Sequence, residues 1–273
     1  MSDIQQVRVY NSPVSDIIND NFSIVITDSV ASDNGQSISN FMRNRNLTSA
    51  WITTESNDSA NTMIECIISD TSTVSDIFLV VHNFKDFDID YFDGVAWVNI
   101  ASVTGNIDDF YHAELTTPVI TTKVRVIIYS TIIADSDKIL TRLIITSKMG
   151  VGQFSSWPVV KNSTQGLIKK DSVMLSGKHR ISQSVGSYSV RLDWKGVTTQ
   201  DDVDIIEQMF LGRKSFLLWI SGGSETQFRF KITGYRRKDF YTVKPRKDYI
   251  ADFYKGIYSA MLTQGIDLVE VVD

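Results

Sequence analysis

The first 148 residues are dominated by short segments in which Val, Ile, Phe and Tyr alternate with polar residues. A period of two over such short lengths predicts half-buried β-strands. The candidate strands are FSIVITD, TMIECIIS, DIFLVVHNF, DFDIDYF, AWVNIA, KVRVIIYST and ILTRLIITSK. Asn, Asp, Ser, Thr and Gly separate them, as expected of turns. Regular short strands without long helices predict a jelly-roll-like β-sandwich, with one short helix near SISNFMRNR.

The segment FKDFDIDYFDGVAWVNI allows two interpretations, a calcium loop or a strand and a turn. An EF-hand loop starting at Asp86 would need Gly at its sixth position and Glu at its twelfth, where Tyr91 and Trp97 stand. A strand fits better, because apolar and acidic residues alternate, and Asp93-Gly94 is typical of a two-residue hairpin turn. The acidic residues would then form one solvated face and a candidate contact surface: Asp86, Asp88 and Asp90.

The composition is that of an ordinary soluble globular protein, with 42% apolar and 22% charged residues. No run of about 18 apolar residues predicts a transmembrane helix, and the first residues lack the pattern of a secretory signal. The single cysteine, Cys66, excludes an intrachain disulfide. We expect a buried, inert thiol there and synthesis in a reducing compartment.

Charge is distributed unevenly along the chain. Residues 1–150 hold 9 Lys and Arg against 19 Asp and Glu, whereas residues 151–273 hold 18 against 13. This asymmetry supports a division into a sandwich (1–148), a Gly- and Ser-containing linker (149–166) and a β-rich domain (167–273). The β-rich domain is expected to contain one short α-helix, which begins near Thr199 and ends at Gly212.

The first half resembles the galactose-binding-like β-sandwich of the discoidin type. The resemblance covers roughly residues 8–148 and rests on the order of LTSAWITTESNDSANTMIECII, IFLVVHNFKDFDIDYFDGVAWVNI, KVRVIIYST and ILTRLIITS. It implies a domain that binds glycans or lipid headgroups through loops at one end, although many members are purely structural. The candidate glycan-contact tip is Asn44, Arg45, Asn46 and Trp51, although a Trp at this point of the fold is more often a core residue.

The second half is similar to bacteriophage tail and baseplate structural proteins over roughly residues 170–273. The similarity rests on VRLDWKGVTTQDDVDIIEQMFLGRKSFLLWISGG and GIYSAMLTQGIDLVEVVD. It implies a virion tail component that is made in the bacterial cytoplasm and forms a threefold or sixfold ring with its copies and other tail proteins. Basic and aromatic residues favour protein interfaces. The expected assembly interface is Arg229, Arg236, Arg237, Lys238, Tyr241, Tyr254 and Tyr258.

Nucleic-acid binding is the alternative for this basic and aromatic segment, and the overall acidity of the chain, with a pI of about 5.3, disfavours it. The histidines His82, His112 and His179 are scattered and form no HExxH or Cys/His zinc spacing. We therefore expect no catalytic residues, metal site or cofactor, and for His82 a turn or core position. The leading hypothesis is a structural tail protein, the alternative is a glycan-binding adhesin, and an enzyme is least favoured.

Overall fold

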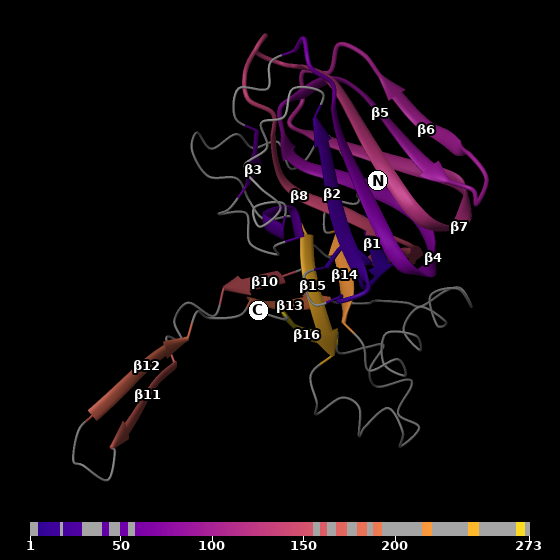
Figure 1. Cartoon of the computed structure of the whole chain (residues 1–273). Coiled ribbons are helices and arrows are strands. Elements are labelled where there is room, and N and C mark those ends of the chain that lie inside the picture. The colour runs from indigo at the N-terminus through magenta and orange to yellow at the C-terminus, as the bar shows by residue number, and fades with distance from the viewer. Residues whose placement is uncertain are drawn as a thin grey trace. The chain divides into compact units, whose positions relative to one another are not determined.

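The structure is a computed structural model (Figure 1). It describes residues 5–16, 19–28, 40–43, 50–53, 58–154, 159–162, 168–173, 179–184, 188–192, 215–219, 240–245 and 266–270. These residues form an almost entirely β structure, in which every pairing with a described register is antiparallel. The predicted mainly-β class is thus confirmed. The chain divides into two compact units, Ser12–Lys148 and the remainder (Met1–Asn11 with Met149–Asp273).

The Ser12–Lys148 unit is built from one continuous sheet in the order β3-β8-β4-β7-β5-β6, with β2 paired to β4. Two strands are much longer than the rest, β4 (Thr62–His82) and β7 (Phe110–Thr131). The shorter ones are β2 (Phe22–Asp28), β3 (Trp51–Ile52), β5 (Phe84–Phe92), β6 (Trp97–Val103) and β8 (Ile139–Thr146). A 3-10 helix at Asn40–Arg43 lies where the short helix was predicted.

The long strands β4 and β7 each belong to both layers of the sandwich. The first part of β4 pairs with β2, whereas its last part, from Asp76, pairs with β8. The β4–β7 register shifts between Ile67 and Ser72 and again between Val74 and Asp76. One layer is therefore β2, the first part of β4, the last part of β7, β5 and β6, and the other is β3, β8 and the remaining parts of β4 and β7.

A single hydrophobic core lies between these layers. Residues from both parts of β4, such as Cys66 and Leu79, belong to the same buried cluster. They alternate with outward-facing residues in the first part of β4, as a half-buried strand requires. From Val74 to Val80 every residue is buried, a pattern typical of a strand covered on both faces. Full burial of each large apolar side chain contributes about 1.5–3 kcal/mol to folding.

The predicted hairpin at Phe84–Ile100 is confirmed, but its turn differs from the prediction. Phe92 pairs with Trp97, so the loop has four residues rather than two. The Asp93 carboxylate oxygen Oδ1 accepts hydrogen bonds from the backbone N–H groups of Val95 (2.8 Å) and Ala96 (2.7 Å). Gly94 adopts a φ of 102°. The Asp side chain thus closes the loop itself, which the two-residue turn rule does not consider.

The other unit contains a seven-stranded sheet in the order β10-β13-β16-β15-β14-β1-β9 and a separate hairpin of β11 and β12. Its strands are β1 (Gln5–Asn11), β9 (Lys148–Phe154), β10 (Val159–Asn162), β11 (Ile168–Val173), β12 (His179–Ser184), β13 (Tyr188–Leu192), β14 (Phe216–Trp219), β15 (Phe240–Pro245) and β16 (Ile266–Glu270).

The sandwich is inserted between two neighbouring strands of this sheet, because β1 precedes it and β9 follows it. The segment 149–166, which we expected to be a linker, contributes β9 and β10 to the sheet. Gly150 and Gly152 lie within β9 and do not prevent its pairing, since the neighbouring strand supplies backbone hydrogen bonds. The helix predicted between Thr199 and Gly212 lies outside the described residues. Within the part of the chain that is described, no helix has the length and apolar character needed to cross a membrane.

Candidate functional site

The outer face of β5, β6 and β7 carries a group of polar and aromatic side chains that contact one another. They face away from the core because their strand neighbours, such as Ile89 and Val126, belong to the buried cluster. We call this group the aromatic–polar patch. It consists of Asp88 and Asp90 on β5, Trp97 and Asn99 on β6, and Arg125 and Tyr129 on β7.

The centre of the patch is an ion pair beside an aromatic ring. Nε of Arg125 donates to Oδ2 of Asp90 over 2.7 Å, and the Asn99 side chain donates to Oδ1 of Asp90 over 2.9 Å. The Arg125 guanidinium carbon lies 4.3 Å from the centre of the Trp97 ring, a cation–π distance. Asp90 is 6% exposed and anchors the group, while 23% of the Arg125 side chain reaches solvent.

A second pair extends the patch along the same face. The Tyr129 hydroxyl donates to Oδ2 of Asp88 over 2.6 Å. This hydrogen bond, together with desolvation, raises the pKa of Tyr129 to about 12. The phenol therefore remains a hydrogen-bond donor held by a carboxylate across the whole neutral pH range. The Asp88 and Asp90 carboxylates on β5 are thus each held by a side chain of the adjacent strand β7, Tyr129 and Arg125.

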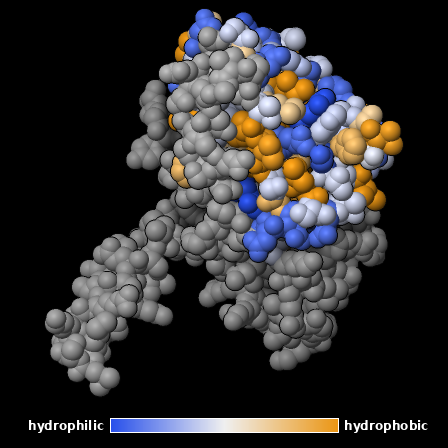
Figure 2. Space-filling model, viewed as in Figure 1, coloured by the Kyte–Doolittle hydropathy of each residue, from blue (hydrophilic) through white to orange (hydrophobic). Residues whose placement is uncertain are grey.

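Several polar groups of the patch remain available to a ligand. Among the described residues, the two terminal nitrogens of Arg125, Oδ1 of Asp88 and the indole N–H of Trp97 take part in no hydrogen bond. The Arg125 nitrogens and the Trp97 indole N–H can donate hydrogen bonds, and the Asp88 oxygen can accept one. In Figure 2 apolar and strongly hydrophilic residues lie next to each other over the described sandwich. The patch itself offers donors and an acceptor beside the Trp97 ring.

The acidic residues of β5 were predicted to form a solvated face, and the structure corrects this. Asp90 is buried by its partners on β6 and β7. Asp86 accepts hydrogen bonds from the Ser130 hydroxyl and from the backbone N–H of Gly105 (2.7 Å). Both bonds lower the pKa of Asp86. Cross-strand partners, which a strand's own sequence cannot reveal, turn the row into a hydrogen-bonded network.

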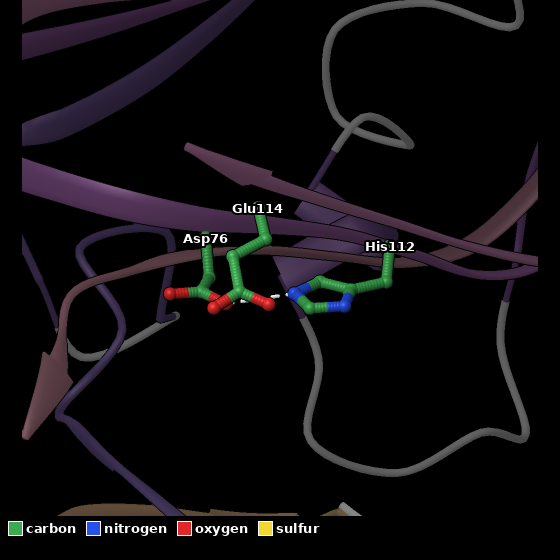
Figure 3. Close-up of side chains that lie close together, drawn as sticks. All are labelled: Asp76, His112 and Glu114. Carbon is green, nitrogen blue, oxygen red and sulfur yellow. Dashed lines mark hydrogen bonds and ion pairs between the residues drawn. The ribbon is translucent and has the colours of Figure 1, made fainter. Parts of the chain in front are cut away.

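A different group, on β4 and β7, has the donor atoms of a metal site. Nε2 of His112 lies 2.7 Å from Oδ1 of Asp76. One potential ligand atom from each of Asp76, His112 and Glu114 lies within 4.8 Å of those of the other two. Figure 3 shows the three side chains converging from the two strands. The Lys148 ammonium contacts Glu114 over 2.6 Å. Nothing in the sequence spacing indicated this group, since Asp76 and His112 are 36 residues apart.

His82 and Cys66 are structural residues. His82 is buried, and its Nδ1 accepts a hydrogen bond from the backbone N–H of Phe84 over 3.1 Å, as a core histidine would. Burial lowers its pKa to about 4. Cys66 is a buried free thiol whose pKa is raised by burial. Both agree with the roles predicted from the sequence.

The predicted contact residues fall largely outside the described part of the chain. Of the glycan-contact tip, Asn44, Arg45 and Asn46 lie outside it. Trp51 is fully buried in the core cluster, the position favoured for it from the sequence. Tyr241 lies on β15, paired with Leu218 of β14. The remaining assembly residues are not described: Arg229, Arg236, Arg237, Lys238, Tyr254 and Tyr258. The predicted assembly interface therefore stays a prediction.

No known family model matches the chain, and no curated protein matches it. Among solved structures, it is similar to a family 32 carbohydrate-binding module from Clostridium perfringens, with 17% identity over 50% of this chain and 99% of that one and a TM-score of 0.40. A chitosan-binding module from a Paenibacillus chitosanase/glucanase shows 14% identity over 50% and 98%, with a TM-score of 0.40. A Ruminococcus gnavus fucosidase shows 9% identity over 50% and 27%, with a TM-score of 0.42. Likenesses this distant transfer neither ligand nor activity.

Proposed function

We propose that the Ser12–Lys148 sandwich is a glycan-binding module, and that its aromatic–polar patch binds a neutral sugar. The observation that carries this proposal is the arrangement of Arg125, which is held by Asp90 and lies against Trp97 while its terminal nitrogens remain open. A planar donor beside an acceptor carboxylate can bind two neighbouring hydroxyl groups of a sugar ring.

The balance of charge favours a neutral ligand over an acidic one. The patch holds two carboxylates, Asp88 and Asp90, against one guanidinium. A carboxylated sugar would be repelled by this excess of negative charge, since like charges close together cost free energy. A hydroxyl-rich neutral sugar can donate to Asp88 and accept from Arg125 without that cost. The Trp97 ring offers apolar surface to the C–H groups of the sugar.

The carboxyl groups of the patch are better suited to binding a sugar than to hydrolysing it. A glycosidase requires a carboxylic acid whose pKa is raised so that it can donate a proton. The patch carboxylates instead serve as hydrogen-bond acceptors, Asp88 for the Tyr129 hydroxyl and Asp90 for Arg125 and Asn99. The patch therefore supports recognition of a sugar as the function of the sandwich.

The test is a screen of the full-length chain against immobilised neutral and acidic glycans, followed by affinity measurements with any glycan that binds. We expect a neutral glycan to bind, and Trp97→Ala and Arg125→Ala each to weaken it at least about tenfold. Lys123→Ala is the matched control, because Lys123 lies on the same strand and pairs with Glu65 instead. A screen without any bound glycan would refute the module, and an affinity unchanged in both variants would refute the patch.

A further inference from the structure

The Asp76, His112 and Glu114 side chains combine a nitrogen donor with two carboxylates on one face of a rigid strand pair. Asp76 lies directly opposite Glu114 in the β4–β7 register, and Phe78 lies opposite His112. Ile77 and Leu79, which alternate with them, face the core. The three donor groups therefore share the opposite face, and regular β-structure fixes the spacing between them.

Neighbouring groups hold these side chains in position. The Ser75 hydroxyl donates to Oδ2 of Asp76 over 2.6 Å and accepts from the backbone N–H of Lys148 over 2.7 Å. The His112 ring stacks on Phe78, with 4.4 Å between the ring centres and 7° between the planes. Hydrogen bonds and packing of this kind orient the ligands in metal sites and strengthen metal binding.

Exposure increases from Asp76 to Glu114, so the group has a buried end and an open end. The Asp76 side chain has no exposed surface, the His112 side chain is 15% exposed, and the Glu114 side chain is 40% exposed. A buried carboxylate is stable only when a partner compensates its charge. A cation can approach from solvent past Glu114 and reach both His112 and Asp76. This gradient gives the group an entry path.

We propose that Asp76, His112 and Glu114 bind a divalent transition metal, with zinc as the best match. Zinc accepts imidazole nitrogen and carboxylate oxygen in tetrahedral sites, whereas calcium and magnesium require oxygen ligands. Bonds of about 2.0 Å place tetrahedral ligand atoms roughly 3.3 Å apart. His112 and Asp76 are 2.7 Å apart, so they need to separate only slightly. Water completes the fourth position.

Lys148 provides a built-in competitor for the metal. Its ammonium contacts Oε1 of Glu114 over 2.6 Å and so neutralises a carboxylate that zinc requires. Zinc binding displaces this ammonium from Glu114. Removal of the Lys148 charge should therefore tighten zinc binding, whereas removal of a ligand should weaken it. His112→Ala removes a nitrogen donor and leaves both carboxylates in place, so weaker binding in this variant distinguishes a specific site from general attraction of cations to an acidic surface.

The test uses the full-length chain without a histidine tag, with zinc chloride and calcium chloride measured by titration calorimetry and by thermal unfolding. We expect one zinc ion per chain, a weakening of at least about tenfold in His112→Ala and in Glu114→Gln, and tighter binding in Lys148→Met. His179→Ala is the control for binding by an unrelated histidine and should keep the wild-type affinity. Glu114 is partly exposed, so Glu114→Gln should fold normally even if His112→Ala does not. Absence of zinc binding, preference for calcium, or an unchanged zinc affinity in Glu114→Gln would overturn the proposal.

Discussion

Arg125 lies directly opposite Asp90 in the β5–β7 register, and its Nε donates to the Asp90 carboxylate over 2.7 Å. The pair differs from an ordinary surface ion pair because Asp90 is nearly inaccessible and also accepts a hydrogen bond from Asn99. It couples three strands of one layer through side chains alone. The same pair orients the guanidinium that we propose binds sugar.

Removal of the Asp90 carboxylate should destabilise the sandwich. Asp90→Ala removes the acceptor of Arg125 Nε and one of the two acceptors of the Asn99 amide, so we expect a loss of about 2 kcal/mol in the free energy of unfolding. Asp90→Ala with Arg125→Ala should cost less than the sum of the single variants, because they share one interaction. Urea unfolding followed by fluorescence measures both. Lys123→Ala breaks the more exposed pair with Glu65 and should cost under about 1 kcal/mol.

Tyr129 should titrate later than ordinary tyrosines. Its pKa of about 12 results first from the hydrogen bond to Asp88. Asp88→Asn should therefore bring this pKa down towards the ordinary value of about 10. The difference in ultraviolet absorbance between the wild type and Tyr129→Phe isolates this one phenol during a pH titration. An unchanged titration in Asp88→Asn would contradict the assigned cause.

His82 should make the sandwich less stable in weakly acidic solution. Its folded pKa is about 4, whereas an unfolded histidine titrates near about 6.5. The unfolded chain therefore binds more protons in this interval, and stability is greatest above pH ~6.5 and falls as the pH decreases towards ~4. The contribution lost is about 3 kcal/mol.

His82→Asn provides the comparison, because the Asn side-chain oxygen can replace Nδ1 as the acceptor for Phe84. The free energy of unfolding of this variant should depend less steeply on pH between ~4 and ~6.5 than that of the wild type. Identical slopes in the two proteins would show that other groups cause the acid sensitivity.

A side chain at Gly94, at the tip of the β5–β6 hairpin, should destabilise the sandwich. Its φ of 102° is rarely adopted by residues with a Cβ, although no atom within 4 Å would clash with one. The cost of Gly94→Ala is therefore backbone strain alone, about 1–3 kcal/mol. Gly105→Asn is the control, because its φ of 69° lies close to the left-handed region that Asn accepts. Thermal unfolding should show a larger decrease for Gly94→Ala than for Gly105→Asn.

The sequence predicts most strands of the sandwich because alternation is a local property. FSIVITD and DFDIDYF, for example, correspond closely to β2 and β5. The beginning of β7, FYHAELTTPVI, was missed because its polar residues and its proline weaken the pattern. β1 was missed as well, since only three of its seven residues are aliphatic or aromatic, Val7, Val9 and Tyr10.

The candidate sites could not be predicted in the same way. Trp97 and Arg125 both lie in predicted strands, yet their contact depends on the register between β5 and its two neighbours. The bulge at Ile89 and Asp90 changes that register by one residue. Asp76 and His112 likewise meet only through the pairing of β4 with β7. The sequence shows which polar and aromatic residues are present, whereas their contacts depend on pairing between strands far apart in the chain.

The two strands that run through both layers have a consequence for how the sandwich folds. Neither layer can be completed before β4 and β7 have paired along their length, and that pairing joins residues as far apart as Thr62 and Ile128. Non-local pairing of this kind slows folding, because loop closure must precede the gain from contacts. The layers should therefore appear and disappear together in a single cooperative transition, with amide hydrogens of β4 and β7 among the slowest to exchange.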